Sequence, residues 1–435
     1  MDYAVGVALF IVGIILSVAL HEMGHMVPAK RFGVRVSQFM VGFGPTLWSR
    51  TVGDTEYGFK AFLLGGYVRI TGMLPHRDEV KPVRGTGWAA RLIEDARETS
   101  MEDVAPGEEQ RAFYRLSWWK KVIVMAGGPV MNLIIAIVAF TVVASGIGLQ
   151  ANSTTVSAVV ECLVPANEDR DCEPGDAPTT AAVVGIEPGD VLVSINGEPI
   201  AFHEFESIRD VIGDLPGQTV PIVVERDGET LTLSGEIQSL LQPARDEYGR
   251  VVVDDNDEVV YEERGFLGVS PTLIRHREPI WGGAAITGEY LLLTGEAVVG
   301  LPRGVWHALQ ASFGDVDRDP EGVVSIVGAA RLSGDVTDSS LGLGDKIALF
   351  LMLLGGVNLA LFVFNMIPVL PLDGGHIAGA LWQAVKNGVA RIRNMPKPAP
   401  VDMARAMPFA YVMFGVLLVV GLVLMWADIV APIEI

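Results

Sequence analysis

Long apolar runs dominate the pattern of hydrophobic and polar positions along this chain. A helix that crosses the hydrocarbon core of a bilayer needs about 20 mainly apolar residues. Four stretches approach or exceed that length: Tyr3–Leu20, Val122–Val143, Ile347 to about Ala384, and Phe409–Trp426. The pattern predicts a polytopic α-helical membrane protein with four transmembrane segments, at residues 1–27, 122–148, 346–385 and 407–430. Because Pro368 and Pro371 interrupt the third segment, we expect it to be broken or partly re-entrant.

Two short β-prone runs lie between the first two apolar stretches. Glu56–Thr71 has the sequence EYGFKAFLLGGYVRIT, in which the runs meet at Gly65-Gly66. This pattern predicts a membrane-associated β-hairpin at residues 56–71. Beside a membrane, such a hairpin offers a strand edge on which an extended peptide could pair, with Gly65, Gly66 and Tyr67 as candidate substrate-binding residues. A plain structural loop is the alternative that this pattern leaves open.

The region between the second and third apolar stretches begins with β-rich patterning. Asn196-Gly197 and Asp227-Gly228 each separate two strand-like runs, as hairpin turns do. Residues 149–271 resemble a PDZ domain of the kind associated with bacterial proteases, with Gly265–Val269 as the expected closing strand. Residues 242–263 form a very acidic insertion, and residues 272–345 are expected to be a juxtamembrane region without a clear pattern.

Composition and charge support and orient this arrangement. Half of the residues are apolar, 19% are charged, and the mean hydropathy is +0.39. Residues 149–345 carry 11 Lys and Arg against 35 Asp and Glu, whereas residues 28–121 carry 15 against 11 and residues 386–405 carry 5 against 1. By the positive-inside rule, residues 28–121 and 386–406 face the cytoplasm and both termini lie outside. We expect contacts with membrane lipid and no nucleic-acid partner.

The chain has two cysteines, Cys162 and Cys172, in the region assigned to the outside. In an oxidising compartment, a pair with this spacing favours a small disulfide-closed loop. Metal binding by cysteine and histidine is the weaker alternative, since the nearest histidine in sequence is His203.

The sequence HEMGH at the end of the first apolar run carries the most specific chemistry. His21 and His25 are four residues apart, so a helix places both imidazoles on one face, where they can bind one zinc ion. Glu22 between them is then positioned to take a proton from a water molecule on the metal. Ionisable residues at the edge of a membrane span are costly and usually functional. The motif therefore predicts hydrolysis within a membrane.

A third protein ligand is expected, because catalytic zinc usually has three. Asp373, in the sequence NMIPVLPLDGGH, is the only acidic residue between Ile347 and Ala384. A single carboxylate at membrane depth needs a partner, and zinc is a suitable one. His376 is the alternative third ligand, and otherwise an outer-shell or interfacial group.

A polar residue also interrupts the second apolar stretch, in the sequence GGPVMN. Asn132 there indicates a polar contact between closely packed helices. Simple helix–helix packing is an equally good interpretation of this residue.

Together these motifs resemble the site-2 protease family of intramembrane zinc metalloproteases. HEMGH, GGPVMN, the PDZ-like insert and NMIPVLPLDGG carry the resemblance, which covers nearly the whole chain and points to the bacterial branch that regulates sigma factors. The resemblance implies that His21, His25 and Asp373 bind Zn²⁺ and that Glu22 is the general base. It also implies that Asn365 contacts the substrate backbone or stabilises the oxyanion.

The resemblance further implies a substrate class and a location. A protein of this family is a multi-pass protein of the bacterial inner (plasma) membrane that cleaves single-span proteins, such as an anti-sigma factor, after an upstream site-1-type protease trims their ectodomains. Two rivals are a non-proteolytic membrane scaffold that presents the PDZ-like domain and a small-molecule metallohydrolase. The intact HExxH and LDGG argue against the scaffold, and the hairpin and PDZ-like insert favour polypeptide substrates.

Overall fold

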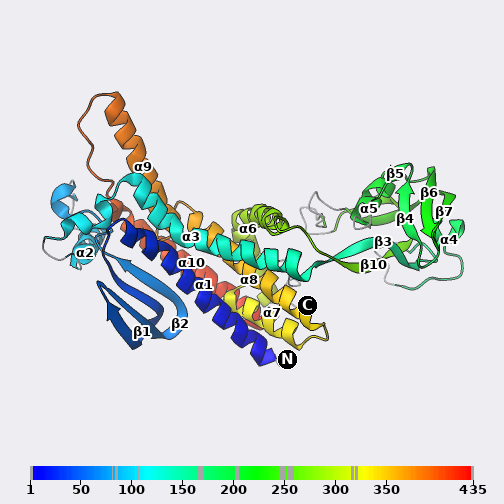
Figure 1. Cartoon of the computed structure of the whole chain (residues 1–435), viewed down its shortest axis with the longest axis horizontal. Coiled ribbons are helices and arrows are strands. Elements are labelled where there is room, and N and C mark those ends of the chain that lie inside the picture. The colour runs from blue at the N-terminus through cyan, green and yellow to red at the C-terminus, as the bar shows by residue number, and fades with distance from the viewer. Residues whose placement is uncertain are drawn as a thin grey trace. The chain divides into compact units, whose positions relative to one another are not determined.

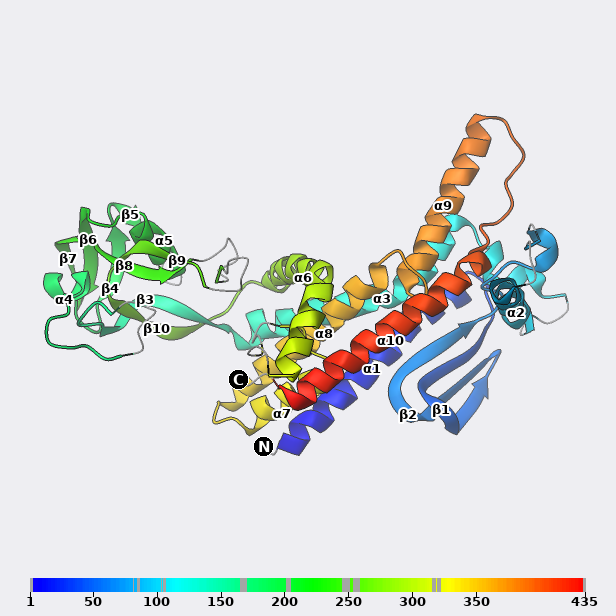
Figure 2. The ribbon, with the colours of Figure 1, turned by 180° about the vertical axis from the view of Figure 1, so that it is seen from behind.

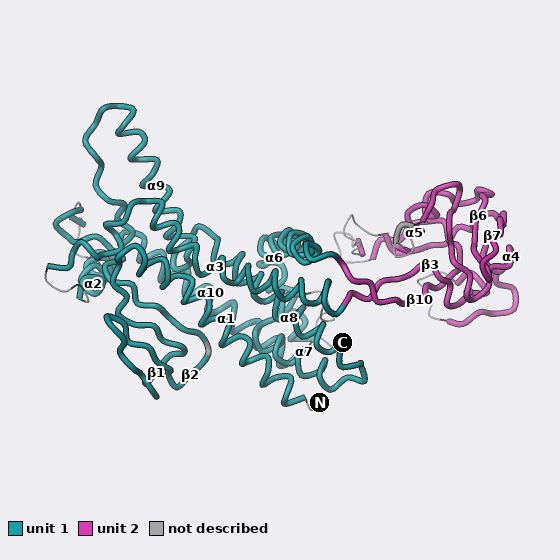
Figure 3. Tube along the Cα trace, viewed as in Figure 1, with its two compact units in different colours: residues 1–147, 279–435 teal, residues 148–278 magenta. Residues whose placement is uncertain are grey.

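The computed structural model describes residues 3–432 except 81, 84–86, 103, 105–106, 165–169, 201–204, 245–250, 253–258, 315–317 and 319–321. The chain divides into two compact units (Figure 3). Unit 1 comprises Met1–Ile147 and Pro279–Ile435, and unit 2 comprises Gly148–Glu278.

Unit 1 is a bundle of long helices with a sheet beside it (Figure 1). Five described helices are long and apolar enough to cross a membrane: α1 (Tyr3–Arg31), α3 (Trp118–Thr141) with its π-helical extension Val142–Ile147, α6 (Gly282–Ser312), α8 (Leu343–Met366), and α10 (Met407–Val430) with the 3₁₀ turn Met403–Ala406. The mean hydropathy of their most apolar windows is 2.4 to 2.6, except for α6, where it is 1.3. Since α6 lies in the predicted juxtamembrane region, the described helices include one more candidate span than the four predicted.

The first helix shows how this bundle is packed. Phe10 and Ile14 of α1 are buried four residues apart, on the face that contacts α7 (Ile326–Asp338) and α8. On the opposite face, Val12 and Leu16 are 61% and 58% exposed. Apolar side chains that face outward are expected where lipid tails replace water, so helix contacts depend on close packing there. Figure 2 shows α10 on the other side of the bundle, where it packs against α6 and α7.

The third apolar stretch is broken where its prolines predict. Helix α8 ends at Met366, and α9 begins at Asp373 and continues to Ile392, seven residues beyond the predicted boundary at 385. The loop between them packs so tightly on the start of α9 that a Cβ on Gly374 would lie only 2.2 Å from the Ile367 carbonyl oxygen. The break places Asp373 in the first turn of a new helix.

Two long strands, β1 (Val36–Val52) and β2 (Thr55–Ile70), form the sheet of unit 1. They meet at a turn that contains Gly53, with φ of 62°. Residues 66–69 pair with residues 38–41, which on their other side pair with residues 56–59. The predicted hairpin within 56–71 is therefore wrong, because its two halves lie on opposite sides of β1. The intervening strand comes from residues before the predicted hairpin, so the local pattern could not reveal it.

Short helices complete the segment between β2 and α3: Arg77–Glu79, α2 (Trp88–Glu102), Glu109–Arg111 and Phe113–Arg115. Arg97 of α2 is 2% exposed and forms ion pairs with Glu94, at 2.9 Å, and with Asp402. This buried pairing fixes α2 to the segment that precedes α10.

Unit 2 contains a six-stranded sheet with the order β10-β3-β4-β6-β7, in which β5 pairs with β4. Its strands are β3 (Leu149–Val159), β4 (Val191–Ile195), β5 (Glu198–Pro199), β6 (Thr219–Arg226), β7 (Glu229–Glu236) and β10 (Val269–His276). Helices α4 (Thr180–Val184) and α5 (Phe205–Gly213) contribute to its core, and β8 (Gln238–Pro243) pairs separately with β9 (Tyr261–Phe266).

The two predicted turns of unit 2 are confirmed. Asn196 and Asp227 have φ of 52° and 50°, and each is followed by a glycine, as the turns between β4 and β5 and between β6 and β7 require. The predicted closing strand 265–269 is wrong. Gly268, with φ of 87°, separates β9 from β10, which pair with different strands. Part of the acidic insertion 242–263 lies outside the described residues.

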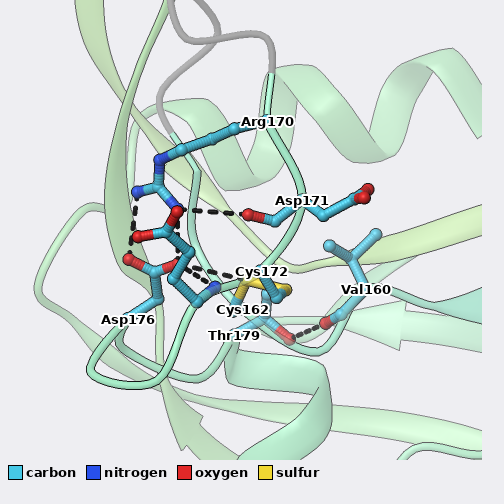
Figure 4. The surroundings of a disulfide bond; sticks show 8 residues. Val160, Cys162, Arg170, Asp171, Cys172, Asp176 and Thr179 are labelled. Carbon is cyan, nitrogen blue, oxygen red and sulfur yellow. Dashed lines mark hydrogen bonds and ion pairs between the residues drawn. A yellow bond between two sulfur atoms is a disulfide. The ribbon is translucent and has the colours of Figure 1, made fainter.

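The two cysteines form a disulfide, with their Cα atoms 5.9 Å apart (Figure 4). Cys162 is buried, and the loop beside the bond is held by Arg170, whose guanidinium donates to both carboxylate oxygens of Asp176 at 2.7 and 3.0 Å. The pairing agrees with the disulfide that the sequence favours.

Candidate metal centre

The structure brings together the three predicted ligands from two distant parts of the chain. His21 and His25 lie on α1, and Asp373 lies at the start of α9. The His21 Nε2 and His25 Nε2 atoms are 3.2 Å apart, and each is 3.4 Å from Asp373 Oδ2. Among the described residues, His21, His25 and Asp373 form the group of three His, Cys, Asp or Glu side chains whose ligand atoms lie close enough together to hold one metal ion.

These separations test whether the residues fit zinc. Ligand atoms placed tetrahedrally at about 2.0–2.1 Å from a zinc ion lie about 3.3 Å from one another. The three measured separations are 3.2, 3.4 and 3.4 Å. Two imidazoles and one carboxylate also form a donor set of catalytic zinc sites, in which the fourth position stays open. The residues therefore fit a zinc ion in both chemistry and spacing.

The backbone of α3 orients the second histidine. His25 is 4% exposed, and its Nδ1 donates to the carbonyl oxygen of Val124 at 2.8 Å. A proton on Nδ1 leaves the lone pair of Nε2 directed at the other ligands. The apolar sequence around Val124 contains no signal for this role, since the contact uses a backbone atom.

A buried asparagine on α3 orients the first histidine. The side-chain amide nitrogen Nδ2 of Asn132, a residue that is 1% exposed, lies 3.1 Å from His21 Nδ1. Among the described residues the Asn132 oxygen, Oδ1, is buried without a hydrogen-bond partner. A half-turn of the amide lets Oδ1 accept the His21 Nδ1 proton, which leaves Nε2 of His21 free to bind metal, as it is in His25. Of the two interpretations of Asn132 that the sequence leaves open, the structure supports the polar contact.

Glycines let α1 and α3 approach closely at the site. A Cβ on Gly24 would lie 2.2 Å from the Gly127 carbonyl oxygen, and one on Gly127 would lie 2.0 Å from the Gly24 carbonyl oxygen. One residue further along, a Cβ on Gly128 would lie 2.2 Å from His25 Nε2 and 2.7 Å from His21 Nε2. The GGPVMN sequence thus supplies a surface without side chains against the ligand atoms.

The predicted base lies beside the sheet. Glu22 follows His21 on α1, and a Cβ on Gly66 of β2 would lie 3.6 Å from Glu22 Cγ. The backbone N–H of Val68 is directed at the Glu22 carboxylate. Among the described residues, residues 66–68 of β2 pair with β1 on one side. Their other edge, which faces Glu22, pairs with no strand.

The other predicted residues lie around this centre in different ways. Asn365 donates from Nδ2 to the Leu361 carbonyl oxygen of its own helix, at 3.0 Å. His376 lies outside the group of ligands and lines a cavity of about 400 Å³ with Arg69 and Tyr411. Tyr67 donates to Gln38 Oε1 at 3.2 Å, which leaves its predicted contact with substrate untested.

Comparison with known proteins identifies the family. The family model "Peptidase family M50" matches residues 9–398. The chain belongs to peptidase family M50. It is 34% identical to zinc metalloprotease Rip1 of Mycobacterium tuberculosis (strain H37Rv), over 100% of this chain and 99% of that protein. It is also 30% identical to zinc metalloprotease Rip1 of Mycolicibacterium smegmatis, over the full length of both, and 26% identical to metalloprotease MmpA of Caulobacter vibrioides, over 87% and 85%.

This M50 protein is a zinc metalloprotease of the site-2 protease family, as its motifs predict. Its apolar helices make it a multi-pass membrane protein, and the family acts on membrane-protein substrates. The enzyme interpretation is thus confirmed over the non-proteolytic scaffold.

Proposed function

We propose that this M50 protease is an intramembrane endopeptidase that cuts single-span proteins within their transmembrane segments. The observation that carries the proposal is the place of the donor group. His21 and His25 follow the apolar run of α1, and Asp373 follows the break in the third apolar stretch. A hydrolytic centre at these positions is reached from the membrane-embedded part of the bundle.

His21, His25 and Asp373 would hold the zinc ion. When bound, zinc supplies a Lewis acid that polarises the peptide carbonyl and activates water. Glu22 accepts the proton of the attacking water and then passes it to the amine of the leaving peptide. Asn132 and the Val124 carbonyl hold both imidazoles in the orientation that this chemistry needs.

The edge of β2 at residues 66–68 supports a role in substrate binding. A transmembrane helix hides its peptide carbonyls in its own hydrogen bonds, so a substrate must unwind before it is cut. An extended segment that pairs along Gly66 and Tyr67 would pass directly beside Glu22. Asn365 would contact the substrate backbone or stabilise the oxyanion, and its amide turns from Leu361 when it does so.

The proposed topology has four spans and both termini outside the cytoplasm. Helix α6 has half the mean hydropathy of the other candidates and carries Glu289, Glu296 and Arg303, so we assign it to the membrane surface. An even number of spans returns the chain to its starting side. Consistent with this, the first turn of α1 and the last turn of α10 lie at the same end of the bundle (Figure 1).

Unit 2 would act as a PDZ-like filter outside the membrane. A cavity of about 90 Å³ lies between α5 and residues 265–269, where Ile208, Ile212 and Leu267 provide an apolar lining for a peptide side chain. We propose that a bulky ectodomain is excluded until an upstream site-1-type protease trims it, and that an anti-sigma factor is such a substrate. Deletion of residues 181–270 should permit cleavage of an untrimmed substrate, and continued exclusion of it would reject the filter.

The experiment that tests the proteolytic role uses the full chain in proteoliposomes with candidate single-span proteins whose ectodomains have been trimmed. Mass spectrometry of the products should place the cut within the substrate's apolar segment. Glu22→Gln should abolish cleavage and retain zinc, whereas the matched control Glu229→Gln in unit 2 should cleave normally. Cuts confined to soluble substrate regions, or full activity of Glu22→Gln, would contradict the proposal.

A further inference from the structure

A pocket of about 560 Å³ lies at the beginning of α3, away from the residues of the metal centre. Its lining comes from four parts of unit 1: the segment before α3, the first turn of α3, the middle of α9, and the loop at residues 397–400. Trp118 and Lys121 come from α3, and Gln383 and Asn387 come from α9.

Two lysines give this pocket its positive charge. Lys121 is half-buried and Lys397 is exposed, and they lie close enough to repel each other. Within the part of the chain that the structure describes, neither ammonium group forms an ion pair with a carboxylate. Two neighbouring cations without an acidic partner are unfavourable by themselves and are stabilised by an anion between them.

The acidic residue in the pocket does not compensate this charge. Glu79 Oε1 accepts hydrogen bonds from the Tyr114 hydroxyl, at 2.9 Å, and from the Arg115 guanidinium. The Arg115 charge therefore balances the Glu79 carboxylate, and the charges of Lys121 and Lys397 remain in excess.

The loop that carries Lys397 is fixed in place. The Val401 backbone N–H donates to Gln383 Oε1 at 2.6 Å, and Lys386 Nζ donates to the Ala399 carbonyl oxygen at 3.0 Å. Gln383 is 8% exposed and also donates to Asn387 Oδ1 at 2.9 Å. A loop held at Ala399 and Val401 keeps the backbone that carries Lys397 at the pocket before any ligand arrives, which lowers the entropic cost of binding.

The position of the pocket indicates the ligand. Trp118 is 39% exposed at the start of α3, and the apolar run begins at Val122, so the pocket lies at the level of lipid head groups. Lysines bind phosphate groups, and basic pockets beside spanning helices suit anionic lipids. We propose that this pocket binds a phosphate group, supplied by the head group of an anionic phospholipid. The same chemistry would accept free inorganic phosphate, and the experiment separates these sources.

Native mass spectrometry of the full chain in detergent provides the test. Phosphatidylglycerol should bind more tightly than phosphatidylcholine, and a large excess of inorganic phosphate should not displace it. The double variant Lys121→Gln/Lys397→Gln should weaken phosphatidylglycerol binding by at least tenfold, since each lysine near an anionic head group contributes roughly fivefold. The double variant Lys121→Arg/Lys397→Arg keeps both charges and should retain most of the affinity.

Lys120→Gln is the matched control, because Lys120 is adjacent on the same helix and lies instead over the rings of Phe32 and Trp119, 5.2 and 5.5 Å from their centroids. It should bind phosphatidylglycerol like the wild type. If inorganic phosphate binds and displaces the lipid, the lipid source is wrong. If the glutamine double variant binds normally, or if Lys120→Gln and the arginine variant lose as much affinity as it does, the pocket is not a phosphate site.

Discussion

At the scale of single residues, the candidate metal centre depends on the glycine at position 128, which has no side chain. Gly128 presents only hydrogen to the two histidine Nε2 atoms, which lie 2.2 and 2.7 Å from the position of a Cβ. Three donor atoms at tetrahedral separations leave no room for one more carbon atom against them. A glycine within an apolar helix, usually a cost to helix stability, is therefore required here by the ligands.

We expect Gly128→Ala to lose zinc, because the new methyl group displaces both imidazoles. The measurement is metal content of the purified protein by inductively coupled plasma mass spectrometry, together with cleavage of a model substrate. Gly146→Ala is the control, since no atom lies within 4 Å of a Cβ at that position. Normal zinc content in Gly128→Ala would show that the histidines bind metal in another arrangement.

Asn132 provides a second prediction at this scale. Asn132→Ala removes the side chain that contacts the His21 ring. Loss of a group that orients a metal-binding histidine lowers metal affinity by roughly 10–100-fold. Asn132→Asp keeps an oxygen acceptor and should lose much less. Competition of each purified variant with a zinc chelator gives the affinities, and equal affinities for wild type and Asn132→Ala would remove this asparagine from the site.

At the scale of elements, the open edge of β2 lies beside Glu22, the residue that we propose as the base. Proline removes a backbone donor from a strand edge. Gly66→Pro should therefore lower cleavage at least tenfold while zinc content stays normal. Leu47→Pro places the same ring at the far side of the sheet, on a residue that is 70% exposed, and should cleave normally. Equal activity of the two variants would argue against strand pairing of the substrate.

The β1 and β2 sheet also shows the limit of local patterns. The sequence EYGFKAFLLGGYVRIT indicates strands and a change of direction near Gly65 and Gly66, and both strand segments are present in β2. Their partner is residues 38–41, which lie outside the run. Strand propensity is a local property, whereas the choice of partner depends on long-range packing against α1.

At the scale of the whole molecule, the two units differ in where they place their apolar side chains. Helices of unit 1 pack through glycines and expose apolar faces, whereas the strands and helices of unit 2 enclose an apolar core. Each unit contains a buried ion pair, formed by Arg97 and Asp402 in unit 1 and by Arg226 and Asp190 in unit 2. Asp190 is 1% exposed and accepts from Arg226 Nε at 2.7 Å and from Arg226 Nη2 at 2.8 Å. The Arg226 guanidinium holds the pKa of Asp190 below its usual value of 3.8.

This pair predicts how unit 2 responds to acid. A carboxyl group whose pKa is lowered by folding stabilises the fold at every pH above its unfolded pKa, near 3.8, and loses that contribution as the pH falls through its folded pKa. The free energy of unfolding of unit 2 should thus fall as the pH drops below about 4, and its backbone amides should exchange faster there. Hydrogen exchange of β4 and β6 in the full chain, corrected for intrinsic rates, measures this.

Asp190→Asn should destabilise unit 2 by about 1–3 kcal/mol at neutral pH and flatten the acid response. Asp227→Asn changes an acid at the neighbouring turn, keeps a residue suited to positive φ, and should preserve the response. An unchanged acid response in Asp190→Asn would assign the pH dependence to other groups.

Local periodicity determined the apolar spans, the placement of His21 and His25 on one helix face, and the break between α8 and α9. The reason is that helix geometry and proline chemistry act over a few residues. Only the tertiary structure brought Asp373 to the histidines, set the Val124 carbonyl and Asn132 against them, and inserted β1 between the halves of the predicted hairpin. These contacts join segments about one hundred or more residues apart, or use backbone atoms that every residue has, so packing of the whole chain decides them.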